Sequence, residues 1–240
     1  MSVRDIELPN YKLRHELFNS ISHGAGSVFG IIIFILCMLK INGVFIPNSL
    51  HLDSLVDKIY ANITIPIYFL GIITCMTMSC IYHALKKNNG KRVFRVLDHS
   101  FIFLLVAGTY TPYCLITLRE ASFYSIPHSN FVGWILLAIV WILCILGIVF
   151  NSINIKKYAP FSMVMYIVSG WSILLFVNEI YTLLDFNGFM LLLFGGISFS
   201  IGAILYGLGA KKSVWWHTVF HFFVLFGVIL QGLSIYLYVL

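Results

Sequence analysis

The chain has 240 residues, of which 60% are hydrophobic and only 10% are charged, whereas about 25% of residues are charged in an ordinary soluble domain. Because so few charged side chains cannot cover the surface of a globule of this size, most of its exterior must face lipid. This composition excludes a soluble single-domain enzyme and indicates an integral membrane protein. The net charge of +6 does not indicate a nucleic-acid partner, because the basic residues form short clusters between apolar runs and no continuous stripe.

Seven apolar stretches reach the length of about 20 residues that a helix needs to cross a bilayer. They fill most of the chain, so we expect an all-α fold in which residues 1–240 form one membrane domain of seven transmembrane helices. Small-residue spacings such as Gly26-x-x-x-Gly30 and Ser198-x-x-x-Gly202 are typical of closely packed membrane helices. The predicted helices span residues 17–39, 62–85, 96–118, 131–150, 159–180, 188–210 and 215–239.

Lysine and arginine are concentrated in alternate connections between these helices. Of the 15 basic residues, 12 lie in the N-terminal segment or in the second, fourth and sixth connections, and Lys91 is one of the 12; only Lys40, Lys58 and Arg119 lie elsewhere. Cytoplasmic connections carry the excess of basic residues. The sequence therefore predicts a multi-pass protein of the cell membrane with a cytoplasmic N-terminus and an external C-terminus.

Five polar side chains lie at the cytosolic ends of three predicted helices. His83 ends the second helix and follows Ser79 by four residues, Asp98 opens the third helix, and His217 and His221 lie in the first turns of the seventh. Each ionisable group inside a span costs about 2.5–3.5 kcal/mol on insertion scales, so each one needs a reason. Because their depths overlap within one leaflet, we expect these side chains to converge.

The spacing of the histidines favours a metal site. His217 and His221 are four residues apart and share one helical face, so with His83 they offer three imidazoles. Three protein ligands and an open fourth position are typical of catalytic zinc, which lowers the pKa of bound water to near 7. Asp98 is the best-placed base for that water. Ser79 has two readings, a hydrogen-bond donor at the site or a serine bonded to its own helix carbonyl one turn back.

A second polar group opens the first predicted helix. Glu16, Asn19 and His23 are spaced so that they share one helical face on the same side of the membrane. We interpret them as a second shell of the metal site or as a packing network beside it.

Three motifs carry a resemblance to a known family. They are Glu-x-x-Asn-x-x-x-His at residues 16–23, Ser-x-x-x-His at residues 79–83 followed by Asp98, and His-x-x-x-His at residues 217–221. In these motifs the chain closely resembles the hemolysin III family, which belongs with the progestin and adiponectin receptors (PAQR), and it is more distantly similar to the alkaline ceramidases.

The resemblance implies a seven-helix bundle with zinc held by His83, His217 and His221, and with Asp98 and Ser79 at the water. Together with the apolar, bilayer-embedded site, it predicts a zinc-dependent hydrolase that acts on an amide bond of a membrane lipid such as ceramide. The alternative is a hemolysin-like lytic protein or a ligand-responsive receptor in which zinc is structural. The predicted partners are membrane lipids, and the sequence does not identify a protein partner.

Overall fold

The computed structural model describes residues 2–44, 52, 54–121, 131–209 and 212–240. Every regular element in these ranges is helical, which confirms the predicted all-α class. The α-helices are α1 (Leu13–Ile41), α2 (Leu55–Ala84), α3 (Asn89–Pro112), α4 (Phe131–Trp171), α5 (Val177–Leu183), α6 (Asp185–Gly209) and α7 (Trp215–Ser234). Short 3-10 or π-helical turns lie at Val3–Asp5, Tyr113–Thr117, Leu118–Glu120, Ser172–Phe176 and Ile235–Val239.

Six helical segments of the described chain are long and apolar enough to cross a membrane. The seven predicted stretches match these six segments except for residue 85, one residue past α2, and residue 210, which lies outside the described residues. The number is six because the predicted helices at 131–150 and 159–180 both lie in the continuous segment Phe131–Leu183. Length and hydropathy thus identify a multi-pass membrane protein.

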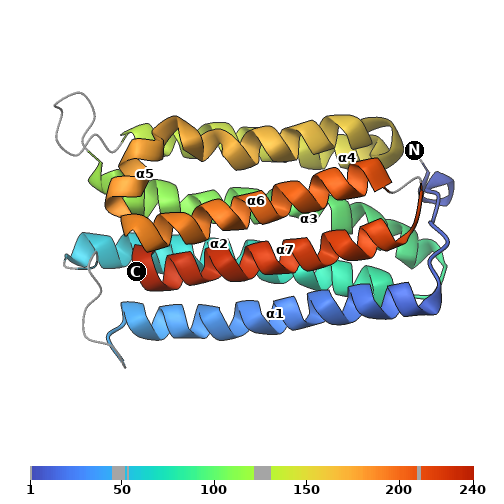
Figure 1. Ribbon diagram of the computed structural model, residues 1–240, viewed down its shortest axis with the longest axis horizontal. Helices are drawn as coiled ribbons and strands as arrows, with labels where there is room; N and C mark the ends of the chain where they lie inside the picture. The colour runs from blue at the N-terminus through green and yellow to red at the C-terminus, as the bar shows by residue number, and fades with distance from the viewer. Residues whose placement is uncertain (1, 45–51, 53, 122–130, 210–211) are drawn as a thin grey trace.

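The long helix α4 turns back on itself at Asn154, whose backbone is extended (φ −162°, ψ 95°). Ser162 donates a hydrogen bond of 2.6 Å to the side chain of Asn151, although eleven residues of straight helix would separate the two by about 16 Å. The Asn151 amide also lies 3.3 Å from the Tyr166 hydroxyl. The two halves of α4 therefore lie side by side (Figure 1).

Helices α2 and α3 begin several residues before the predicted starts at 62 and 96. Ser54 and Asp57 form a reciprocal capping box at the start of α2, and the Asn88 side chain accepts a 2.8 Å bond from the backbone N–H of Lys91 at the start of α3. These caps satisfy the free N–H groups of the first turns. Charged residues interrupt the added turns, Asp57 and Lys58 in α2 and Lys91, Arg92 and Arg95 in α3, so the apolar runs used for the prediction did not include them.

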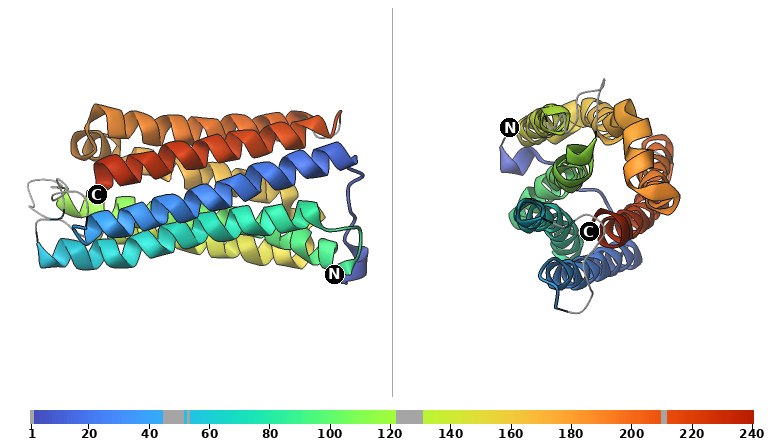
Figure 2. Two further views of the ribbon diagram at one scale, coloured as in Figure 1. Left: turned by 90° about the horizontal axis from the view of Figure 1, so that it is seen from below. Right: turned by 90° about the vertical axis from the view of Figure 1, so that its left-hand side faces the viewer.

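The helices stand nearly parallel and are arranged in a ring in the end-on view (Figure 2). Along the chain, α1 packs on α2, α2 on α3 and α3 on α4, while α7 packs between α6 and α1. Helices α1, α3 and α7 begin, and α2 ends, at the same end of the bundle (Figure 1). The predicted polar residues of these four helices are therefore brought to that one end.

Small residues allow close approach at two of these interfaces, as predicted. A Cβ atom on Gly26 would lie 2.8 Å from the sulfur of Met76 between α1 and α2. Between α6 and α7, a Cβ on Gly202 would lie 2.8 Å from the Cβ of Phe223, and Ser198 donates a 2.7 Å bond to the Phe223 carbonyl. These contacts hold α7 firmly against α6, which fixes the position of the α7 histidines.

Candidate metal centre

Three buried imidazoles converge between α2 and α7. The Nε2 atom of His217 lies 3.2 Å from Nε2 of His83 and 3.0 Å from Nε2 of His221. One ligand atom from each ring lies within 4.8 Å of the others. The structure therefore brings together the three histidines that the sequence predicted to converge.

The protons available to these rings do not explain the contacts. His83 Nδ1 lies 2.6 Å from Glu16 Oε2, and because a carboxylate only accepts, Nδ1 carries the proton. In the tautomer with one proton, the lone pair of Nε2 then faces inward. His217 Nε2 faces both other rings but holds at most one proton, so one of its two short contacts has none to share. A cation between the three nitrogens would satisfy all of them.

The spacing of the nitrogens suits a tetrahedral zinc ion. Zinc–nitrogen bonds of about 2.0–2.1 Å at tetrahedral angles put neighbouring ligand nitrogens about 3.3 Å apart. Two of the three separations here, 3.0 and 3.2 Å, are close to this value, and the ligand atoms of His83 and His221 lie within 4.8 Å of each other. Three neutral imidazoles leave a fourth position for water or substrate. The donor set fits the metal that the sequence predicted.

Glu16, at the start of α1, supports His83 from outside the cluster. One carboxylate oxygen accepts the Nδ1–H of His83, and the other lies 2.6 Å from Nζ of Lys91. Metal-binding histidines commonly donate their second N–H to a carboxylate, which fixes the orientation of the ring. Glu16 thus lies where an outer-shell carboxylate would lie.

His23 and Asn19 extend the polar region along α1. The ring of His23 lies 3.9 Å from the ring of His221, measured between centroids. Both residues are buried, and within the described chain neither the ring nitrogens of His23 nor the amide atoms of Asn19 have a hydrogen-bond partner. Buried polar atoms normally have a partner in the protein, in water or in an ion, so this region suits bound water beside the cluster.

Asp98 and Ser79 take different places around the histidines. Asp98 is buried and lines a cavity together with His217 and His221, but it is not one of the three converging ligands. Ser79 is fully buried one turn before His83, and its hydroxyl has no partner among the described residues. The bond to its own helix carbonyl, which was one of the two readings of this serine, is therefore not formed.

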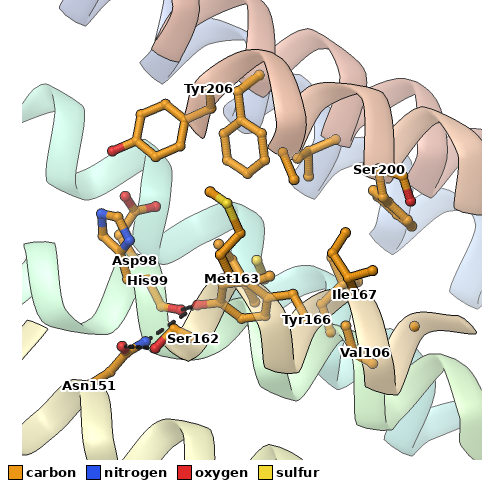
Figure 3. Close-up of a pocket in the computed structure, with 18 of the residues that line it drawn as sticks. Asp98, His99, Val106, Asn151, Ser162, Met163, Tyr166, Ile167, Ser200 and Tyr206 are labelled. Atoms are coloured by element: carbon orange, nitrogen blue, oxygen red, sulfur yellow. Dashed lines mark hydrogen bonds between the residues drawn. The ribbon is translucent and has the colours of Figure 1, made fainter. Parts of the chain in front are cut away.

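The cavity has a volume of about 290 Å³ and runs between α3, α4, α6 and α7. Figure 3 shows Asp98 and His99 of α3 at the same end of the cavity as Tyr206 of α6. From this polar end the cavity extends between mainly apolar side chains as far as Trp171 and Gln231. A chain-like apolar ligand could lie along it with one end at the histidines.

The sequence did not predict that two tyrosines and a further histidine lie at the site. The ring of Tyr11 stacks on His217 at 5.2 Å and 16°, and Tyr206 lies 5.3 Å from the same ring. Burial raises the pKa of Tyr11, so its phenol stays neutral. His99 lines the cavity. Tyr11 precedes the first apolar run, and Tyr206 and His99 belong to no motif, so neither hydropathy nor spacing marked them.

Residues before α1 cover this end of the bundle. Arg92 donates to the carbonyl of Ile6 at 3.1 Å, and Arg95 donates to the carbonyl of Glu7. Lys156 forms a 2.8 Å ion pair with Glu7, and this contact lowers the pKa of the carboxyl group. The N-terminal segment is thereby tied to α3 and α4 and carries Tyr11 to the histidines.

Comparison with known proteins gives matches over nearly the whole chain. The family described as Haemolysin-III related matches residues 11–232. The chain is 33% identical over 228 residues to Hemolysin-3 of Bacillus cereus, covering 95% of this chain and 93% of the relative. It is 30% identical over 219 residues to a Hemolysin-3 homolog of Bacillus subtilis (strain 168), covering 90% and 91% respectively. No solved structure matches the chain.

Proposed function

The chain belongs to the haemolysin-III-related family of multi-pass membrane proteins, and from that premise we propose that it is a zinc-dependent hydrolase of lipid amides. One observation carries the proposal: three buried imidazoles converge, and two of them, His217 and His221, line an apolar cavity whose polar end also contains the carboxylate of Asp98. A metal that only pinned α2 to α7 would need neither the carboxylate nor the cavity.

The proposed membrane arrangement has seven crossings with a cytoplasmic N-terminus. The turn at Asn154 supports two crossings within α4, each half being long enough to approach the width of a bilayer. The basic residues support the orientation, and Lys91, which is buried in the first turn of α3, lies at the same end of the bundle as the other described residues of the basic excess.

Reporter fusions to the C-terminus test this arrangement. Seven crossings place Leu240 outside, so alkaline phosphatase fused there is expected to be active and green fluorescent protein to be dark. The same reporters fused after Lys87 should behave in the opposite way. A fluorescent C-terminal fusion would mean an even number of crossings and would contradict the arrangement.

His83, His217 and His221 are the proposed zinc ligands, with Glu16, Asn19 and His23 as the surrounding shell. When bound, zinc would act as a Lewis acid that polarises a carbonyl and lowers the pKa of a bound water. The residues of α1 would keep the rings in place, Glu16 through the Nδ1–H of His83 and His23 through its contact with His221.

Asp98 and Ser79 are the proposed catalytic residues. The Asp98 carboxylate would accept a proton from the attacking water as the water oxygen bonds to the amide carbon, and would pass that proton to the leaving nitrogen as the carbon–nitrogen bond breaks. The Ser79 hydroxyl, which has no partner in the described chain, would donate to the developing oxyanion. The products would be a fatty acid and an amine.

The cavity supports a lipid as the substrate. Its lining is mainly apolar beyond the polar end, and an acyl chain can remain out of water there. A ceramide, in which an amide joins an acyl chain to a long-chain base, has the required amide beside an apolar chain. An ester lipid of the same length is the less favoured substrate.

Hydrolysis by the purified protein tests the proposed activity. Detergent-purified protein is expected to release fatty acid and amine from ceramide, detected by mass spectrometry. A chelator should abolish this release and added zinc should restore it. No release from any N-acyl lipid by zinc-loaded, folded protein would contradict the proposal.

A second candidate function is membrane lysis, because the similar Bacillus proteins are called hemolysins. Liposomes that contain a dye but no amide lipid separate the two functions. Dye release that persists in the double variant His217→Ala, His221→Ala would favour a lytic protein. The absence of dye release by wild-type protein that hydrolyses ceramide in detergent would favour the enzyme.

A further inference from the structure

Lys91 is a buried cation beside the proposed metal site. It occupies the first turn of α3 with 2% of its surface exposed, while its neighbours Lys86 and Lys87 are exposed. In the sequence all three lie in the second connection, between the predicted helices that end at 85 and begin at 96. The structure separates them, because the start of α3 at Asn89 turns Lys91 inward.

Three groups fix the Lys91 ammonium. Its Nζ lies 2.6 Å from Glu16 Oε1 and 2.9 Å from the carbonyl oxygen of Leu85, at the end of α2. The same atom lies 5.1 Å above the ring of Tyr82. A carboxylate, a helix C-terminal carbonyl and an aromatic face all favour a positive charge.

Local helix electrostatics do not account for a lysine in this place. The first turn of a helix is the positive end of its dipole, where a cation is disfavoured, and burial adds the cost of removing the charge from water. The contacts to Glu16 and Leu85 offset both costs. The contacts of Lys91 with Glu16 and Leu85, and not its place in α3, therefore account for this buried lysine.

Glu16 links Lys91 to the histidines. One oxygen of the carboxylate is bonded to Lys91 and the other to Nδ1 of His83. With Lys91 in place, the carboxylate cannot rotate away without losing a buried ion pair. We propose that Lys91 is a positioning residue that fixes Glu16 and thereby directs Nε2 of His83 at the metal. This inference rests on the proposed zinc site.

Zinc affinity of purified protein tests the role of Lys91. Competition with a chromophoric chelator is expected to show that Lys91→Met binds zinc about 10–100-fold more weakly than wild type, the usual effect of losing an outer-shell partner. Lys91→Arg keeps the charge and should recover most of the affinity. Lys87→Met, an equivalent change at an exposed lysine, should bind as wild type does.

A double-mutant cycle distinguishes positioning from a general effect on stability. If Lys91 acts through Glu16, Lys91→Met should weaken zinc binding little further in a Glu16→Gln background. The visible spectrum of the cobalt-substituted protein should change in Lys91→Met and not in Lys87→Met, because it reports the ligand geometry. Additive losses in the cycle would overturn the proposal, and if Lys91→Met does not fold, comparison of Lys91→Arg and Lys91→Gln supplies the same test of charge.

Two outcomes separate this inference from the proposed function. Wild-type protein that binds no zinc would remove the metal site and the role of Lys91 together. Wild-type protein that binds zinc, beside a folded Lys91→Met with the same affinity and cobalt spectrum, would overturn the role of Lys91 alone.

Discussion

Asp98→Asn is expected to abolish hydrolysis of lipid amides while zinc remains bound. Asparagine keeps the shape of the side chain but cannot accept the proton of the attacking water, and losing a general base typically costs roughly 10²–10⁴-fold in rate. Asp98 is not one of the three converging ligands, so the zinc content should stay close to that of wild type. The measurement is fatty-acid release at saturating lipid, with metal analysis of the same preparation.

Asp185→Asn is the matched control for this variant. Asp185 is exposed at the start of α6, at the end of the bundle away from the histidines, and asparagine tolerates its left-handed backbone (φ 56°). This control should keep full activity. Full turnover by Asp98→Asn would exclude Asp98 as the base.

The double variant His217→Ala, His221→Ala is expected to lose both zinc and activity. Only His83 would remain of the three converging ligands, and one imidazole does not hold zinc against dilution in a chelator-free buffer. The zinc content should fall from about one ion per chain to almost none, as measured by elemental analysis.

His15→Ala controls for the loss of a buried imidazole in general. His15 is buried against Trp215, with the ring centroids 4.2 Å apart, and is not part of the cluster. It should retain its zinc. A double variant that elutes as folded protein and still carries a full complement of zinc would show that the metal binds elsewhere.

The helices and the histidine cluster could be predicted because each depends on a strong local signal. A run of about 20 apolar residues has few alternatives to a membrane helix, and ionisable groups in such runs are costly unless they find partners. The i, i+4 spacing of His217 and His221 follows directly from helix geometry. These signals were sufficient to select His83, on another helix, as the third converging ring.

The rest depends on how the helices turn and end, which a linear pattern does not specify. Lys91 lies in a polar stretch that is typical of a connection between helices. Its side chain points inward because α3 begins at Asn89. Tyr11 reaches His217 because the N-terminal segment is tied down by Arg92 and Arg95, contacts between residues far apart in the sequence. The reversal at Asn154 lies in the predicted connection between residues 150 and 159, but the sequence does not indicate that a single extended residue makes the turn.

X-ray absorption at the zinc edge of the wild-type protein tests the central claim most directly. The protein has five cysteines, all free in the structure, so sulfur ligands offer a real alternative to imidazole. Three histidines and one oxygen predict a first shell of four nitrogen or oxygen atoms at about 2.0–2.1 Å, with the outer scattering of imidazole rings. A first shell containing sulfur at about 2.3 Å, or protein purified without chelator that carries no zinc, would contradict the three-histidine site.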